Sequence, residues 1–118
     1  AAALALLKDA AGAEAARKLD RAPTLVAVSV VTSADPVEAG EDRDAAAVAA
    51  YIVLLAAHAR GLAGYWRTPG ILREPAGRAA LAIPDEERVL GLLHLGTARQ
   101  AQRVPERADP RDFVTWLP

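Results

Sequence analysis

The sequence contains no cysteine, which excludes disulfides, thiolate nucleophiles and cysteine-ligated metals. It also lacks an excess of either charge: the net charge is −1 at pH 7 and the isoelectric point is about 6.1. A nucleic-acid partner would require a basic face, so we expect none. The longest apolar run, 45–57, is shorter than the roughly 20 residues of a membrane span, and no signal peptide is visible. We therefore expect a cytoplasmic protein, in keeping with the absence of cysteine.

Motifs for common catalytic chemistry are also missing. The chain has no G-x-S-x-G elbow, no P-loop and no G-x-G-x-x-G fingerprint. His58 and His94 are the only histidines, and neither has a carboxylate at metal-ligand spacing, so we expect satisfied core or edge histidines and no metal site. The sequence thus predicts no catalytic nucleophile or acid–base pair from the protein itself.

What the sequence does contain is an alternation of helical and extended patterns within one domain, residues 1–118. The expected elements are a helix at 1–19 broken at Gly12, a buried strand at 24–31, a helix at 43–60, strands at 62–66 and 88–96 separated by a short helix at 73–83, and an extended tail from 97. In the first helix, Glu14 and Lys18 are expected to form an ion pair at i,i+4 spacing. The polar segment 33–42 is expected to be a loop, with Asp42 or a neighbour capping the next helix. This order predicts a layered α/β or α+β domain whose sheet is covered by helices.

The helix expected at 43–60 is apolar on almost every side. A helix without a polar face belongs inside a structure, and a chain of 118 residues would struggle to cover it. The tail also ends in apolar residues, namely Phe113, Val114, Trp116 and Leu117, which usually dock against something. We therefore expect a homodimer.

Aromatic residues are few, at two Trp, two Tyr and one Phe, yet Tyr65 and Trp66 stand side by side before Arg67 and Thr68. A Trp at a strand end is often a core residue, so a structural role and a binding role both remain open for Trp66. Arg67 at the end of a strand favours binding, because ligands of open α/β sheets gather at the carboxyl ends of strands. A guanidinium, a hydroxyl and a free backbone N–H would suit a planar anionic cofactor such as a flavin.

The segment "RAPTLVAVSV", followed by "LLAAHARGLAGYWRTPGILREPAGRAALAIPDEERVLGLLHLGTARQ", resembles the C-terminal two-thirds of the nitroreductase family, in particular the short bacterial NAD(P)H nitroreductases. The resemblance runs from Arg21 to Leu117, and its most specific parts are W-R-T and L-G-T at the right mutual spacing. It implies an α+β nitroreductase-like fold with a central mixed sheet covered by helices and an extended C-terminal tail. It also implies an intertwined homodimer.

The resemblance further implies an FMN-dependent oxidoreductase that passes hydride from NAD(P)H through the flavin to nitroaromatic or quinone acceptors. By position, Trp66, Arg67 and Thr68 correspond to the family's flavin-contacting segment. The family's nicotinamide-binding segment corresponds to Ala56, Ala57, His58, Ala59, Arg60 and Gly61. Arg99 and Arg103, just after the last strand, are the local candidates for contacting the FMN phosphate.

Members of the family also bind the FMN phosphate through an N-terminal R-R-S-x-R motif, which does not occur in these 118 residues. Because the sequence begins without Met and inside a helical pattern, we expect roughly sixty further residues upstream that carry this phosphate-binding motif. Two alternatives remain open. One is a flavin-free structural or dimerisation module of the same fold, and the other is flavin chemistry of another kind, such as dehalogenation or flavin breakdown.

Overall fold

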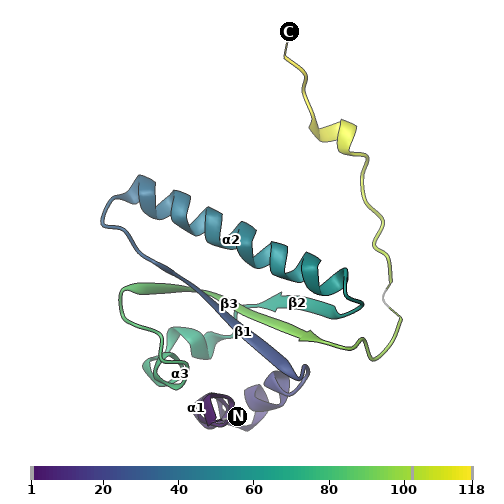
Figure 1. The fold of residues 1–118 in the computed structure, drawn as a ribbon. Helices are drawn as coiled ribbons and strands as arrows, with labels where there is room; N and C mark the ends of the chain where they lie inside the picture. Colours follow the sequence, from purple (N-terminus) through teal and green to yellow (C-terminus); the bar gives the residue numbers. More distant parts are fainter. Residues whose placement is uncertain (1, 102, 118) are drawn as a thin grey trace.

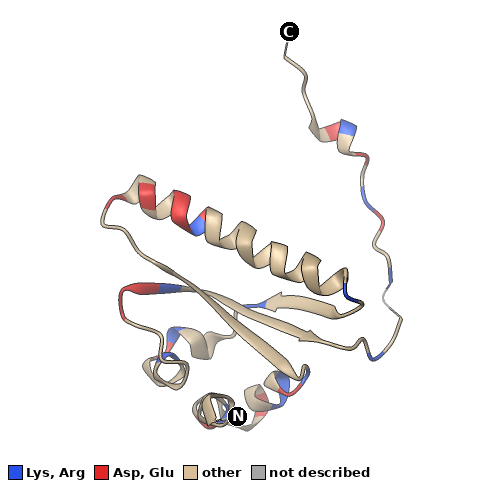
Figure 2. Cartoon of the chain, viewed as in Figure 1, with Lys and Arg blue, Asp and Glu red and all other residues tan. Residues whose placement is uncertain are grey.

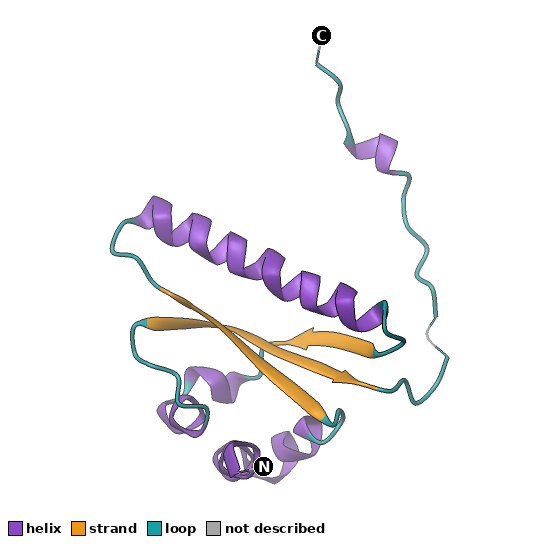
Figure 3. Cartoon of the chain, viewed as in Figure 1, coloured by secondary structure: helices purple, strands orange, loops and turns teal. Residues whose placement is uncertain are grey.

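The computed structural model describes residues 2–101 and 103–117 and has an α+β fold, as predicted (Figures 1 and 3). Its elements are α1 (Ala2–Leu19), β1 (Thr24–Val31), α2 (Pro36–His58), β2 (Ala63–Arg67), the 3₁₀ turn η1 (Gly70–Arg73), α3 (Pro75–Ala80), β3 (Glu87–Gly96) and the 3₁₀ turn η2 (Pro110–Phe113). The strands lie where the sequence predicted them, to within a residue or two.

The three strands form one sheet in the order β1-β3-β2. Both pairings are antiparallel, so the described part of the sheet is not the mixed sheet that we expected. The central strand β3 is a nearly continuous apolar run whose middle, residues 91–94, is buried, as is typical of a strand covered on both faces. By contrast, β1 was predicted to be a buried strand but is an edge strand that stays half exposed.

The sheet lies between two helical layers, with α2 on one face and α1 and α3 on the other (Figure 1). Small residues let α2 approach closely: Ala50 and Ala57 are its buried residues, and a Cβ added to Gly64 on β2 would lie 2.9 Å from Leu54 Cδ2. The main core is on the opposite face and consists of Leu7, Leu19, Leu72, Ala80 and Leu92.

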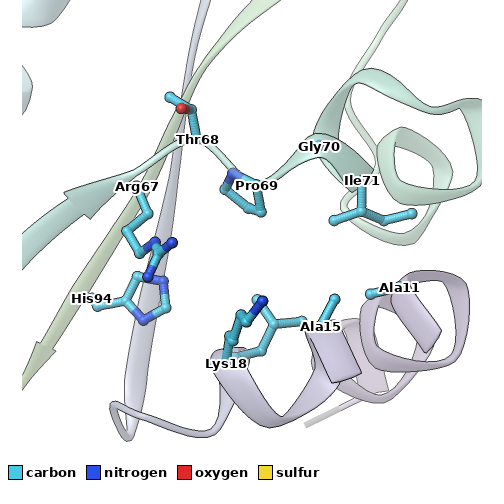
Figure 4. A pocket seen from close by; sticks show the side chains of 10 residues that line it. Ala11, Ala15, Lys18, Arg67, Thr68, Pro69, Gly70, Ile71 and His94 are labelled. Atoms are coloured by element: carbon cyan, nitrogen blue, oxygen red, sulfur yellow. The ribbon is translucent and has the colours of Figure 1, made fainter. Parts of the chain in front are cut away.

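The first helix follows the sequence prediction closely. It extends over Ala2–Leu19, but Gly12 has φ 75° and ψ 164°, so the predicted break at Gly12 is confirmed. A positive φ of this kind is easily adopted only by glycine. The predicted i,i+4 pair is also present, with Lys18 Nζ 2.9 Å from Glu14 Oε1. After the break, the second half of α1 runs below the end of β2 (Figure 4).

The prediction for the start of α2 was wrong. Residues 36–42 are helical rather than a loop, and the cap is Asp35 rather than Asp42. The Asp35 carboxylate accepts hydrogen bonds from the backbone N–H groups of Val37 and Glu38, at 2.7 and 3.2 Å. Pro36 occupies the first helical position, where its missing N–H costs nothing. The proline and acidic residues that suggested a loop are therefore a helix start signal.

Much of α2 is exposed in the single chain. Its charged residues cluster near its N-terminal end, and the remainder of its surface is uncharged up to the last turn (Figure 2). The exposed fractions of Val48, Tyr51, Ile52 and Leu55 are 59%, 57%, 56% and 49%. We call these four residues the α2 stripe. Within residues 2–101 and 103–117, no helix has both the length and the apolar character needed to cross a membrane.

The tail beyond β3 extends away from the body of the molecule (Figure 1). The Cα radius of gyration is 17.0 Å, whereas a compact chain of this length would have about 13.5 Å. Phe113, Trp116 and Leu117 are 77%, 89% and 85% exposed. The chain therefore presents two unpartnered apolar surfaces, the α2 stripe and the end of the tail.

Candidate functional site

The cluster Tyr65–Thr68 forms the end of β2 and the start of the following turn. Trp66 pairs with Leu93 and Arg67 pairs with Leu92 on the central strand. Because successive side chains in a strand point to opposite faces, Trp66 lies on the α2 side with Gly64 and Arg67 lies on the α1 side. The structure thus separates two side chains that we had expected to line one site.

A β-bulge in β3 holds Trp66 in place. In the β1–β3 register Gly91 pairs with Val28 and Val89 pairs with Ser29, so Leu90 is left over. Its carbonyl oxygen accepts a hydrogen bond from the Trp66 indole Nε1–H at 3.1 Å. Gly91 has φ 152°, and an added Cβ there would lie 2.3 Å from Trp66 Nε1. The bulge therefore supplies both a hydrogen-bond acceptor and the space that the indole needs.

On the α1 side, a pocket of about 300 Å³ opens between α1 and the segment that follows β2 (Figure 4). We call it the β2-end pocket. It is lined by Ala11, Ala15, Lys18 and Leu19 of α1, by Arg67, Thr68, Pro69, Gly70 and Ile71, and by His94. Two of the three residues predicted to contact flavin, Arg67 and Thr68, line it, and Trp66 does not.

The charged side chains lining the β2-end pocket are Lys18 and Arg67, both cationic. Lys18 is paired with Glu14, whose own side chain does not line the pocket. Arg67 has no ion pair with any carboxylate in residues 2–101 and 103–117. An unpaired guanidinium on a concave surface attracts anions, so the electrostatics of this pocket favour an anionic ligand.

His94 lines both this pocket and a second one, and its exposed fraction is only 2%. Its ring stacks on Tyr65 with centroids 4.5 Å apart and planes inclined by 17°. Its Nδ1 is buried and has no hydrogen-bond partner in the described part of the chain, so the prediction of a satisfied histidine is wrong for this atom. Burial lowers the pKa of His94 below its ordinary value of 6.5, and the nearby Arg67 and Arg21 charges lower it further.

This shift predicts that His94 makes folding sensitive to mild acid. The unfolded chain has the ordinary histidine pKa and so binds a proton more readily than the folded chain in the window below about pH 6.5. The free energy of unfolding should therefore fall as the pH drops through that window. Denaturant titrations at a series of pH values should show a smaller fall for His94→Gln than for the original protein. Equal pH profiles for the two proteins would contradict this prediction.

The second pocket has a volume of about 400 Å³ and lies where β2 begins and β3 ends. Arg21 and Arg99 are its charged lining residues, and Tyr65, His94 and Thr97 also contribute. Arg99 thus lies in a cationic pocket, as a phosphate contact would require, but not in the pocket that contains Arg67. Arg103 is exposed in the tail and lines neither of these pockets.

The segment predicted to bind nicotinamide forms the last turn of α2 and the turn after it. Ala57 is buried against the sheet, whereas His58, Ala59, Arg60 and Gly61 are exposed. Arg60 folds back to donate a hydrogen bond to the Ala56 carbonyl at 3.0 Å. None of these residues lines the β2-end pocket, because α2 is on the opposite face of the sheet.

Two parts of this site were not predicted from the sequence. Lys18 was noted only as half of an ion pair, although it also lines the pocket. The Tyr65–His94 stack joins residues that are far apart in the sequence, and only the strand register brings them opposite each other. The rule that drew attention to Arg67 applies to parallel sheets. Here the sheet is antiparallel, and the pocket exists because α1 leaves a gap below the end of β2.

No group of three or more His, Asp or Glu side chains within the described ranges, 2–101 and 103–117, is arranged to hold a metal ion. The residues that line the β2-end pocket offer several groups for ligand recognition. Arg67 and Lys18 supply positive charge, Thr68 supplies a hydroxyl, and α1 and Ile71 supply apolar surface. Such a combination orients a small ligand with both an apolar and an anionic part.

The fold and the W-R-T strand end define an α+β protein of nitroreductase-like architecture, and comparisons with known proteins agree. The chain is 29% identical over 99 residues to an Escherichia coli (strain K12) protein named "Putative NAD(P)H nitroreductase YdjA". It is 33% identical over 102 residues to a Haemophilus influenzae protein named "Putative NAD(P)H nitroreductase". Each match covers 82% of this chain and 54% of the relative. The chain thus spans about half the length of these relatives.

Solved structures show the same fold. A nitroreductase-like family protein from Bacillus cereus superposes with a TM-score of 0.78 at 18% identity, over 98% of this chain and 66% of that one. An FMN-dependent nitroreductase from Clostridium difficile R20291 superposes with a TM-score of 0.65 at 20% identity, over 88% and 62%. No family model matches the sequence. The resemblance to the nitroreductase family and its fold, predicted from the sequence, are confirmed.

Proposed function

We propose that this chain is part of an FMN-dependent oxidoreductase that passes hydride from NAD(P)H through the flavin to nitroaromatic or quinone acceptors. The observation that carries the proposal is the unpaired Arg67, which stands with Thr68 in the family-like W-R-T segment at the mouth of a pocket. The relatives named as NAD(P)H nitroreductases and the FMN-dependent neighbour support the same reaction class.

The residues of the β2-end pocket fit a flavin phosphate or another electron-rich part of the cofactor. The pocket is lined by cations without a carboxylate, and a backbone segment with Pro69 and Gly70 borders it. When bound, FMN would supply the hydride-accepting and hydride-donating chemistry. Arg67 would hold negative charge, Thr68 would offer its hydroxyl and backbone, and the walls of α1 and Ile71 would exclude water. The bulge at Leu90 would keep the strand end in register through Trp66.

Visible absorbance and turnover test this proposal together. The protein as its gene encodes it should bind FMN, which is seen as a flavin absorbance band that survives gel filtration. It should then oxidise NADH or NADPH only when a nitroaromatic or a quinone is present. FMN that elutes freely, combined with no acceptor-dependent oxidation of either nucleotide, would contradict the proposal.

We also propose that the protein works as a homodimer. The residues of the α2 stripe are about half exposed in the single chain, and the tail ends in exposed Phe113 and Trp116. Exposed apolar surfaces of this kind often mark sites of contact between protein chains. A second copy placed on the α2 stripe would cover it, and the tail, which extends away from the body of the molecule, would be available to contact that copy (Figure 1).

Charge placed in the α2 stripe should therefore break the dimer. Ile52→Glu combined with Leu55→Glu would bury two carboxylates without partners, at a cost of several kcal/mol. Light scattering should report a dimer for the original protein and a monomer for the double variant at micromolar concentration. Leu6→Glu is the matched control, because Leu6 is 58% exposed on α1, on the other side of the sheet. A monomeric original protein, or a double variant that stays dimeric, would contradict this proposal.

The alternative function is a flavin-free dimerisation module of the same fold. The exposed α2 stripe favours it, because that surface needs a partner whether or not a flavin is bound. The two functions differ in the absorbance experiment above: a dimer that never binds flavin would favour the module, and a dimer with FMN would favour the oxidoreductase.

A further inference from the structure

The β2-end pocket and the second pocket lie on the same face of the sheet and share His94. Tyr65 and Arg67 are two residues apart in β2, and His94 pairs with Tyr65, so all three side chains are on the α1 face. One pocket is at the last residues of β2, and the other is where β2 begins and β3 ends. An elongated ligand that lay along β2 on this face would therefore pass from one pocket to the other beside His94.

The second pocket contains two arginines that the antiparallel pairing of β1 and β3 brings together. Arg21 precedes β1 and Arg99 follows β3, and the start of β1 lies beside the end of β3. The approach is close, since a Cβ added to Gly96 would lie 2.5 Å from Pro23 Cδ. Neither arginine forms an ion pair with a carboxylate in the described part of the chain, and no Asp or Glu from that part lines the pocket. Two guanidinium groups without carboxylate partners suit a phosphate dianion.

The β2-end pocket offers less positive charge and more apolar surface. Lys18 is already paired with Glu14, which leaves Arg67 as the cation without a carboxylate partner among the described residues that line it. Ile71 and the alanines of α1 face each other across the pocket (Figure 4). Apolar walls beside one guanidinium suit a planar ring with electron-rich carbonyl oxygens better than they suit a phosphate.

We propose that one FMN molecule spans both pockets, with its ring in the β2-end pocket and its phosphate between Arg21 and Arg99. This inference rests on the proposed function and adds to it the direction of the cofactor and a role for Arg21. Burial lowers the pKa of His94, and the charges of Arg67 and Arg21 lower it further, so both guanidinium groups lie near the ring that separates the pockets. His94 Nδ1 has no hydrogen-bond partner in the described part of the chain, and the hydroxylated linker of FMN carries groups that pair with such an atom.

Riboflavin separates the two ends of the cofactor, because it has the same ring and linker but no phosphate. FMN and riboflavin are each titrated into the protein as its gene encodes it, and binding is followed by flavin fluorescence. Arg21→Met should weaken FMN binding about tenfold or more and leave riboflavin binding unchanged, since the lost hydrogen bond is to the phosphate. Arg67→Met should weaken the binding of both flavins by a similar factor, since Arg67 contacts the ring that they share.

The phosphorus NMR signal of bound FMN gives a readout that a merely structural arginine would not move. The charged and titratable groups that line the second pocket are Arg21 before β1, Tyr65 of β2, His94 of β3 and Arg99 after β3. Two guanidinium groups favour the dianion, so the bound phosphate should stay dianionic at a pH below its ordinary second pKa of about 6. In Arg21→Met the phosphate should titrate closer to that ordinary pKa. Identical phosphorus titrations in the two proteins would overturn the placement of the phosphate.

Arg88→Met is the matched control, because Arg88 is an exposed arginine of β3 that lines neither pocket, and both flavin affinities should stay unchanged. A thermal melt of each variant shows whether a lost affinity reflects unfolding. If Arg67→Met weakens only FMN while Arg21→Met binds both flavins like the original protein, the cofactor lies the other way round and the inference is wrong, although the proposed function stands. A protein that binds neither flavin would contradict the proposed function itself, and this inference with it.

Discussion

Replacing Gly91 by alanine is expected to destabilise the protein by about 2–4 kcal/mol, because the change combines overpacking with backbone strain. The added Cβ would lie 2.3 Å from Trp66 Nε1 and 2.5 Å from the Arg67 carbonyl oxygen, and φ is 152°. Neither neighbour can move freely, since one is held by a hydrogen bond to Leu90 and the other is backbone. The measurement is the free energy of unfolding from urea titration followed by circular dichroism.

Gly40→Ala is the matched control for that measurement. Gly40 lies in α2, and nothing lies within 4 Å of the position where its Cβ would be. Alanine is a better helix former than glycine, so this variant should be up to about 1 kcal/mol more stable than the original protein. Equal stabilities for Gly91→Ala and Gly40→Ala would mean that the bulge is not tightly packed around Trp66.

Trp66→Ala is expected to damage both the fold and the proposed cofactor site. Truncating a buried tryptophan typically costs about 3–5 kcal/mol, and Trp66 is partly buried, so a cost of about 3 kcal/mol is expected. The same change removes the contact that fixes the Leu90 bulge, and with it the position of the Arg67 carbonyl and of Thr68. Flavin affinity should therefore fall along with stability, as measured by a thermal melt and a flavin fluorescence titration.

Trp66→Phe separates packing from hydrogen bonding. Phenylalanine keeps most of the apolar contact but loses the Nε1–H that donates to Leu90, so the variant should lose only about 1 kcal/mol. A Trp66→Ala protein that is as stable as Trp66→Phe would contradict the packing role given to the indole.

The sequence predicted the elements well wherever local chemistry decides them. The strand 24–31, the break at Gly12 and the Glu14–Lys18 pair are local features, and the structure has all three. The start of α2 was missed, although its signal is also local. Asp35 followed by Pro36 forms an N-cap, but the acidic residues and glycine that follow resemble a loop. Here the N-cap residues predict where the helix begins better than the overall polarity of the segment does.

The site could be predicted only in part, because its geometry depends on register. Arg67 and Thr68 do line a pocket, but Trp66 is on the other face of the sheet, as the alternation of a strand requires. The bulge at Leu90 lies in the run from Val89 to Leu93, and its one local signal is Gly91, since an isolated glycine within a strand often marks a bulge. The stacking of Tyr65 on His94 and the unpartnered Nδ1 likewise follow from pairing between distant strands.

The α2 stripe is the exposed part of the apolar helix that the sequence predicted. The sequence showed a helix without a polar face, and the structure leaves its large residues exposed while Ala50 and Ala57 pack on the sheet. Small residues on the inner side allow the helix to approach the strands closely, and Leu54 on that side lies against Gly64. That arrangement turns the larger apolar side chains outward, where the proposed partner copy would cover them.

The central claim is that the end of β2 binds the flavin through Arg67, and a flavin titration of Arg67→Ala tests it most directly. The experiment uses the protein as its gene encodes it, with Arg88→Ala as the matched control and a thermal melt of each variant. Arg67 is exposed and unpaired, so its removal should change stability by no more than about 0.5 kcal/mol. FMN binding should nonetheless weaken by about 1.5–3 kcal/mol, while Arg88→Ala should bind FMN like the original protein. If Arg67→Ala lowers the melting temperature while FMN affinity stays the same, the strand end is structural and the proposed site is wrong.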